Sequence, residues 1–260
     1  MPVRLGAVSY LNARPCVMGL DRDPRFDLRF DVPARCAALL HEGVVDVGLI
    51  PSIEYLRGSN DLRIVSDIGI ISCGPVASVA LYTSRPVADI RSIALATSSR
   101  TSVALTKVLC ARAFEIQPTF EQAEPDLSAM LARCDAALII GDLALLSEGR
   151  RNVEKIDLGE VWTRHTGLPF VFAFWAGRAS ALSSDDVRKL QEARDAGVAA
   201  SAQVARDYFA DPALQAIAAR YLRDNISYHL GEQELAGLKT FYRWAAELGL
   251  VPEGREPRFF

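Results

Sequence analysis

Small polar residues follow several of the predicted strands, at positions where a bound ligand would meet them. Between residues 9 and 74 these are Ser9, Tyr10, Asn12, Ser52, Ser72 and Gly74, and between residues 99 and 167 they are Ser99, Arg100, Thr101, Ser102, Asp142, Thr166 and Gly167. Hydroxyl groups and free backbone N–H groups at the start of a helix can hold an anion. The same residue types are also the preferred N-caps of helices, and for any single residue capping is the simpler interpretation. For the set as a whole, we favour ligand binding.

Acid–base and covalent chemistry have weaker support in the sequence. His165, Asp142 and Glu54 are candidates for proton transfer, although a lone histidine is more often structural or solvated. No Ser-His-Asp or Cys-His pattern stands out, and the glycine-rich loops that bind nucleotide phosphates are absent. The turn at Thr166 and Gly167 has an alternative role, because Gly167 would also end a helix that begins near Leu158.

The cysteines and histidines offer no recognisable metal site. There are five cysteines, an odd number, and no two have the Cys-x-x-Cys spacing. The three histidines, His41, His165 and His229, lie far apart in the sequence. We therefore expect no metal and no disulfide framework.

Strands and helices alternate in the first third of the chain, as in proteins with parallel sheets. The expected strands are Val3 to Val8, Phe26 to Val32 and Asp46 to Ile50, and a helix over Pro33 to Glu42 lies between the last two. In such sheets, ligands bind beyond the carboxyl ends of the strands, where the polar residues above are found.

The middle of the chain repeats this plan. Strands are expected over Ile93 to Ala96 and Asp135 to Ile140, with a helix over Val103 to Phe114 between them. Thr97 lies 88 residues after Ser9, and Asp135 lies 89 residues after Asp46. We interpret this as two related α/β lobes in tandem, the alternative being that any two such units look alike at this level.

The last third of the chain is predicted to be helical after an apolar strand over Val171 to Trp175. Helical patterns cover Val187 to Phe209, Pro212 to Arg223 and Glu232 to Leu248. We expect these helices to pack back on the first lobe. The predicted architecture is an α/β fold with residues 1–83 and 178–260 in lobe 1 and residues 84–177 in lobe 2. Each lobe would hold a mainly parallel sheet flanked by helices, with the ligand cleft between the lobes.

Composition and charge restrict the partners. The 260 residues are 50% hydrophobic and carry a formal charge of −3, so no net positive field attracts nucleic acid or anionic lipid. The apolar runs are too short to span a bilayer. The first residues resemble a strand of a folded domain rather than a secretory leader. We therefore expect a cytoplasmic protein that binds a small molecule, with no nucleic-acid or membrane partner. The sequence leaves a monomer and a homodimer open.

Six motifs occurring in order resemble those of one enzyme family. They are Ser9-Tyr10-Leu11-Asn12, Asp46-Val47-Gly48-Leu49-Ile50-Pro51-Ser52, Gly74-Pro75-Val76-Ala77-Ser78-Val79, Ser98-Ser99-Arg100-Thr101-Ser102, Leu138-Ile139-Ile140-Gly141-Asp142 and Thr166-Gly167-Leu168-Pro169-Phe170-Val171-Phe172-Ala173. Together they resemble the chorismate dehydratases of the futalosine route to menaquinone. Each motif is weak by itself, but the set spans roughly residues 3 to 176.

The resemblance implies the two-lobed fold of type II periplasmic binding proteins and the loss of water from chorismate, a carbon–oxygen lyase reaction without a cofactor. The product would be 3-[(1-carboxyvinyl)oxy]benzoate. By motif position, Asn12 and Ser78 match the catalytic residues of the family, and a carboxylate of the substrate itself is a proposed proton acceptor. Two alternatives use the same fold: a non-catalytic solute-binding protein and the sister enzyme 1,4-dihydroxy-6-naphthoate synthase. The sister family, however, has a different first loop from Ser9-Tyr10-Leu11-Asn12.

Overall fold

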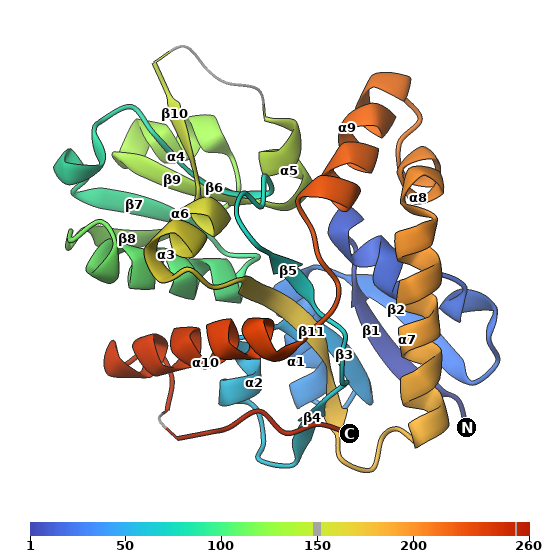
Figure 1. Ribbon diagram of the computed structural model, residues 1–260. Helices are drawn as coiled ribbons and strands as arrows, with labels where there is room; N and C mark the ends of the chain where they lie inside the picture. Colours follow the sequence, from blue (N-terminus) through green and yellow to red (C-terminus); the bar gives the residue numbers. More distant parts are fainter. Residues whose placement is uncertain (148–151, 253) are drawn as a thin grey trace.

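Two β-sheets, one in each lobe, organise the computed structural model, which describes residues 1–147, 152–252 and 254–260 (Figure 1). The first sheet has the order β2 (Phe26–Asp31), β1 (Val3–Val8), β3 (Val47–Pro51), β11 (Phe170–Arg178) and β4 (Leu62–Ile64), and β5 (Ile70–Ser72) also pairs with β11. The second sheet has the order β10 (Glu154–Asp157), β6 (Val79–Thr83), β9 (Ala136–Ile140), β7 (Ser92–Ala96) and β8 (Thr119–Ala123).

Both sheets contain the same arrangement of four strands. In the first sheet, β2, β1 and β3 run parallel, and β11 pairs antiparallel with β3. In the second sheet, β8, β7 and β9 run parallel, and β6 pairs antiparallel with β9. The expectation of mainly parallel sheets was therefore wrong: three strands of each lobe run parallel, but three of the five strand pairs in the first sheet and two of the four in the second are antiparallel. The repeated order agrees with the predicted tandem arrangement.

The sheets divide the chain at different points from those expected. Strand β6 was placed in lobe 1 by the boundary at residue 83, but it pairs in the second sheet with β9 and β10. Strand β11 was placed in lobe 2, but it pairs in the first sheet with β3, β4 and β5. The connections between sheets are therefore residues 73–78 and the turn that precedes β11. Both strands are apolar and buried. Each follows directly after a crossover and pairs antiparallel with a strand of the sheet that the chain has just entered, β6 with β9 and β11 with β3.

Helices flank both sheets. The first lobe contains η1 (Leu11–Val17), η2 (Leu20–Arg22), α1 (Pro33–His41) and α2 (Glu54–Arg57). The second lobe contains η3 (Val87–Asp89), α3 (Arg100–Arg112), α4 (Leu127–Arg133), α5 (Gly141–Leu146) and α6 (Leu158–Thr166). Most of the buried apolar residues of the two lobes form one continuous cluster, so the lobes share a core.

The last helices return to the first lobe, as expected. They are α7 (Ser184–Ala199), α8 (Ser201–Tyr208), α9 (Pro212–Asp224) and α10 (Glu232–Glu247). Helix α7 packs on η1 and α8 packs on α9 along one side of the molecule, while α10 lies against β11 and α3 (Figure 1). A Cβ atom on Gly197 would lie 2.2 Å from the carbonyl oxygen of Pro15, so only glycine permits this approach of α7 to η1.

Within the described residues, no helix is both long enough and apolar enough to cross a membrane.

Candidate active site

One cavity is lined by residues from both lobes, at the carboxyl ends of β1, β3 and β9. Its lining consists of Val8, Tyr10, Asn12, Pro33, Pro51, Ile70, Val76, Ser78, Val79, Ser99, Thr101, Ser102, Ile140, Gly141, Phe172 and Ala173. Six of the residues predicted from the sequence are therefore brought together here: Tyr10, Asn12, Ser78, Ser99, Thr101 and Ser102. This is the place where α/β sheets bind ligands.

Asn12 enters the cavity from the first turn of η1. The chain leaves β1 at Val8, and Tyr10 caps η1 with extended backbone angles. The ring of Tyr10 lies against Gly141 of the second lobe, where a Cβ atom would approach it to 3.0 Å. Gly141 also has a φ of +65°, so glycine is favoured there by both its backbone and its neighbour. Burial raises the pKa of Tyr10, and its side chain hydrogen-bonds to Ser98.

Ser78 is presented by a tight turn in the first crossover. The Ser78 amide donates to the carbonyl oxygen of Val76 at 2.7 Å, and Ala77 between them has a φ of +60°. A hydrogen bond between residues two apart with this φ is typical of the rare, strained γ-turn. The Asp157 carboxylate accepts the amides of Val76 and Ala77 at 3.0 and 2.6 Å and so holds the turn. Backbone strain maintained by surrounding contacts is common at functional sites.

A buried tyrosine from the C-terminal helices joins the two predicted catalytic side chains. The hydroxyl of Tyr221, on α9, lies 2.7 Å from Ser78 Oγ, and the Asn12 side chain also hydrogen-bonds to it. Burial raises the pKa of this phenol well above its ordinary value. The Tyr221 hydroxyl therefore links the Asn12 and Ser78 side chains through hydrogen bonds that lie behind the cavity wall.

The second lobe contributes the start of α3. Ser99 is the N-cap, and its Oγ accepts the amide of Ser102 at 3.3 Å. Thr101 Oγ1 accepts the amide of Ile53, in the first lobe, at 3.3 Å. Arg100 instead is exposed and lines a separate groove with Lys107, outside the cavity. The free N–H groups and dipole of this helix favour a negative charge next to Ser99 and Ser102.

Three further predicted residues lie close to the lining without being part of it. Asp142 accepts the amide of Leu11 at 3.3 Å and the hydroxyl of Tyr208 at 2.5 Å, which connects the two lobes. The carbonyl of Ser9 accepts from the same Tyr208 hydroxyl at 3.2 Å. Ser52 Oγ donates to the carbonyl of Val171 at 2.7 Å. Burial raises the pKa of Asp142, while the two hydrogen bonds lower it in part.

Four predicted residues lie elsewhere. Ser72 is fully buried, and a Cβ atom on Gly159 would lie 2.7 Å from its hydroxyl oxygen, so it faces α6. The Gly74 amide donates to Thr163 Oγ1, also on α6. Thr166 and Gly167 end α6, where Gly167 has a φ of +71°. These four residues lie at the two connections between the sheets, where they contact or end α6, and they do not line the cavity.

The cavity wall is uncharged. Among the described residues, those that line it include no acidic, basic or imidazole side chain. His165 and Glu54 lie away from it, His165 exposed beside the Trp244 ring and Glu54 paired with Arg57 at 2.6 Å. Such a site can orient a ligand and donate hydrogen bonds to it, but the wall supplies no strong base.

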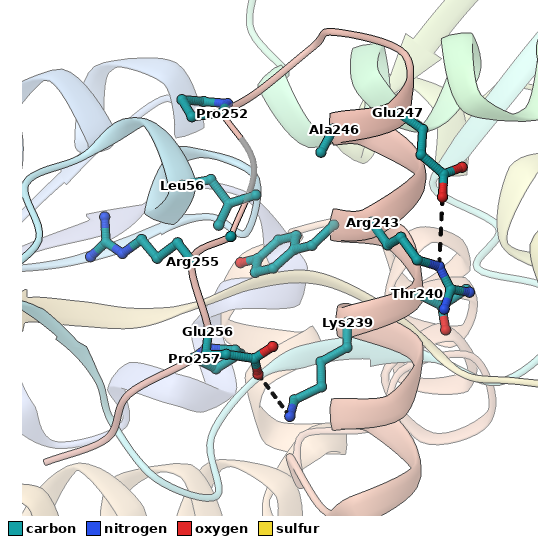
Figure 2. Close-up of a pocket in the computed structure, with 12 residues that line it drawn as sticks. Leu56, Lys239, Thr240, Arg243, Ala246, Glu247, Pro252, Arg255, Glu256 and Pro257 are labelled. Carbon is teal, nitrogen blue, oxygen red and sulfur yellow. Dashed lines mark ion pairs between the residues drawn. The ribbon is translucent and has the colours of Figure 1, made fainter.

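A second cavity lies between α10 and the C-terminal segment, and Figure 2 shows its lining. The Lys239 ammonium is 2.8 Å from the Glu256 carboxylate, and the Arg243 guanidinium is 3.9 Å from Glu247. The first pair joins α10 to the C-terminal segment, whereas the second lies along α10 itself (Figure 2). None of the residues predicted from the sequence lines it, so we place the functional site in the interlobe cavity.

Sequence reasoning missed three tyrosines of the C-terminal helical region. Tyr208 binds Asp142, Tyr221 binds Ser78, and the Tyr228 hydroxyl donates to the carbonyl of Asn12 at 3.0 Å. Tyr208 ends α8, Tyr221 lies on α9 and Tyr228 follows α9, and each has apolar residues within two positions, so no local signal separates them from core residues.

In the described part of the chain, no group of three or more His, Cys, Asp or Glu side chains is placed to hold a metal ion.

Known proteins resemble this chain over nearly its whole length. A sequence family described as menaquinone biosynthesis matches residues 3–247. A protein of Thermus thermophilus named chorismate dehydratase is 34% identical, covering 96% of this chain and 96% of that protein. A protein of the same name from Campylobacter jejuni is 27% identical, covering 95% of this chain and 99% of its own.

Solved structures support the architecture. The alkanesulfonate-binding protein of Xanthomonas axonopodis pv. citri, solved with bound MOPS, matches with a TM-score of 0.69 at 17% identity and covers 97% of this chain and 94% of its own. At that identity the likeness concerns the fold alone, and it is the predicted two-lobed type II periplasmic-binding-protein fold.

Proposed function

Because the chain belongs to the menaquinone biosynthesis family, we propose that it is a chorismate dehydratase, a hydro-lyase that removes water from chorismate. The observation that carries the proposal is the meeting of Asn12 and Ser78 in one uncharged cavity between the lobes. Relatives named chorismate dehydratase, aligned over nearly their whole length, support it.

The reaction balances without a redox cofactor. Chorismate loses the hydroxyl group of one ring carbon and the hydrogen of the neighbouring carbon, which bears the enolpyruvyl ether. A carbon–carbon double bond forms between these two carbons, and the ring becomes aromatic. The products are 3-[(1-carboxyvinyl)oxy]benzoate and water. Because aromatisation drives the reaction, the protein has mainly to orient the substrate and assist departure of the hydroxyl.

Asn12 and Ser78 supply hydrogen bonds to the reacting part of the substrate. The Asn12 amide orients the ring hydroxyl or the enolpyruvyl side chain of the substrate. The Ser78 hydroxyl donates to the departing oxygen from the side opposite Asn12. Donors fixed before the reaction stabilise developing charge more than mobile water does. The turn held by Asp157 keeps Ser78 in place.

A substrate carboxylate binds at the start of α3. Ser99, Thr101 and Ser102 line the cavity there, and the helix dipole favours a negative charge at this end. Chorismate carries two carboxylates, so one can be anchored here while the other remains near the ring.

The proton acceptor is the carboxylate of the substrate's own enolpyruvyl side chain. The wall of the cavity offers no ionisable base among the described residues, and this carboxylate lies within the same molecule as the proton it removes. Proton removal by a group that is already positioned needs no further encounter. As a biosynthetic enzyme with a small-molecule substrate, the protein would act in the cytoplasm.

Incubating the purified protein with chorismate and following the products by mass spectrometry tests the proposal. We expect an ion 18 mass units below chorismate that matches 3-[(1-carboxyvinyl)oxy]benzoate, and we expect it to form about 10²-fold more slowly in Asn12→Ala. Binding of chorismate without any product would indicate a solute-binding protein and overturn the proposal.

A further inference from the structure

Tyr221 connects two residues that approach the cavity from distant parts of the chain. Its hydroxyl lies 2.7 Å from Ser78 Oγ and is hydrogen-bonded to the Asn12 side chain. Helix α9 brings it there from the C-terminal region, and only 2% of Tyr221 is exposed. The hydroxyl does not line the cavity, so any effect on a ligand acts through Asn12 and Ser78.

The partners of Tyr221 differ from those of other buried tyrosines. Tyr228 donates to the carbonyl of Asn12, and Tyr242 donates to the carbonyl of Ser52. Backbone carbonyls satisfy a buried phenol and require nothing of the surrounding side chains. Tyr221 instead contacts two side chains whose orientation matters for the reaction.

We assign the direction of these hydrogen bonds from the number of protons that each group can donate. A phenol and a serine hydroxyl each have one proton to donate, whereas the Asn12 amide nitrogen has two. Burial raises the pKa of Tyr221, so the phenol stays protonated and remains a donor near neutral pH. In this assignment Asn12 donates to the phenol oxygen and the phenol donates to Ser78 Oγ, so the Ser78 proton is left for another acceptor. Among the described residues Ser78 Oγ has no other side-chain partner, and Ser78 lines the cavity, so in this assignment its proton is available to a ligand there.

We infer that Tyr221 is a positioning residue, which aims the Ser78 proton at the departing hydroxyl of the substrate and holds the Asn12 amide in register with it. The inference rests on the proposed dehydratase function and adds a residue from the C-terminal helices to its machinery. Without the phenol hydroxyl, Ser78 would rotate and donate elsewhere for part of the time. The chemical step would slow, while binding of the carboxylates at α3 would be unaffected.

Tyr221→Phe tests this, because it removes the hydroxyl and keeps the ring. Tyr55→Phe is the matched control, since Tyr55 is also fully buried and, within the described part of the chain, its hydroxyl hydrogen-bonds to backbone groups, of Leu62, Glu256 and Arg258. We expect kcat to fall about tenfold in Tyr221→Phe with KM nearly unchanged, on the scale of one neutral hydrogen bond. Tyr55→Phe should show a similar decrease in Tm and an unchanged kcat.

A double-mutant cycle separates positioning from stability. In a Ser78→Ala background, Tyr221→Phe should lower kcat little further, because the proton that it aims is already gone. Equal kcat in wild type and Tyr221→Phe, or a full tenfold effect in the Ser78→Ala background, would overturn the inference. A wild-type protein that forms no product from chorismate would instead overturn the proposed function, and this inference with it.

Discussion

The Asp157 carboxylate and the Ala77 backbone amide are joined by a hydrogen bond of 2.6 Å across the first crossover. Asp157 also accepts the amide of Val76 and caps α6 through the amide of Glu160. One carboxylate from β10 therefore fixes both the start of a helix and the strained turn that presents Ser78.

Replacing Asp157 should affect stability and activity together. Asp157→Ala removes three hydrogen bonds to backbone amides, so we expect a loss of ~2 kcal/mol in the free energy of unfolding. We also expect a lower kcat, because the turn at Ala77 would relax and move Ser78. Urea unfolding and steady-state kinetics measure the two effects. Asp126→Ala is the control, since Asp126 caps α4 through two amides, far from the cavity, and should lose stability without losing kcat.

Loss of the Asn12 amide should mainly slow the chemical step. Asn12→Ala is expected to lower kcat by about 10²-fold or more, the scale for one positioned donor in a transition state. The fold should survive because Tyr228 binds the backbone carbonyl of Asn12 rather than its side chain. Circular dichroism and Tm establish that the variant is folded. Near-normal turnover in a folded Asn12→Ala protein would contradict the assigned role.

The structure separates the cap of α3 from its anchoring hydroxyl. Ser99 Oγ accepts the amide of Ser102, so Ser99→Ala should lower the Tm, as expected when an N-cap is lost. In the described residues the Ser102 hydroxyl has no hydrogen-bond partner, although it lines the cavity. Ser102→Ala should therefore raise KM with little change in kcat. The expected loss of binding free energy is roughly 1.5–3 kcal/mol, the contribution of one hydrogen bond to a charged group. An unchanged KM in Ser102→Ala would remove this hydroxyl from the substrate site.

Asp142 should give the protein a stability that depends on pH. Burial raises its pKa above the usual 3.8, despite the hydrogen bonds from Tyr208 and Leu11. A carboxyl whose pKa is higher in the folded state holds its proton more tightly there, so its contribution to stability falls as the pH rises from 3.8 through the raised pKa. Asp142→Asn should lack this fall. Urea unfolding of both proteins at several pH values in and above this window tests it, and a difference that stays constant with pH would contradict it.

The five cysteines should differ sharply in reactivity. Burial raises the pKa of Cys16, Cys36 and Cys110 to about 12, and the pKa of Cys134 is raised by burial as well. Cys73 is exposed in the crossover before Gly74. Because the thiolate is the reactive form, Ellman's reagent should label one thiol rapidly in the native protein and five in urea. Cys73→Ser should abolish the rapid phase, and rapid labelling of two or more thiols would show that a buried cysteine is accessible.

Local patterns were sufficient for the longer strands and helices. Strand β1 (Val3–Val8) begins and ends where predicted, and α1 and α9 differ from their predicted ranges by one residue at one end. Strands β4, β5, β6, β8 and β10 were not predicted. Strands β4 and β5 have only three residues each, and half-exposed edge strands such as Thr119–Ala123 lack a clear apolar pattern. The single helix predicted over residues 187–209 is broken at Ala200, between Ala199 and Ser201. The break lets α7 pack on η1 while α8 packs on α9.

The sequence by itself determined the class of fold, the alternation of its elements and the polar residues at the ends of its strands. These follow from periodicity and capping, which act over a few neighbouring residues. Only the tertiary structure decided which of those residues share a cavity, and that Thr166 and Gly167 end a helix outside it. It also decided that β6 belongs to the sheet of the second lobe and β11 to the sheet of the first. It also brought Tyr221 to Ser78, across 143 residues of chain. This contact depends on how α9 packs against residues 73–78. The sequence of α9 indicates only that one face of the helix is apolar.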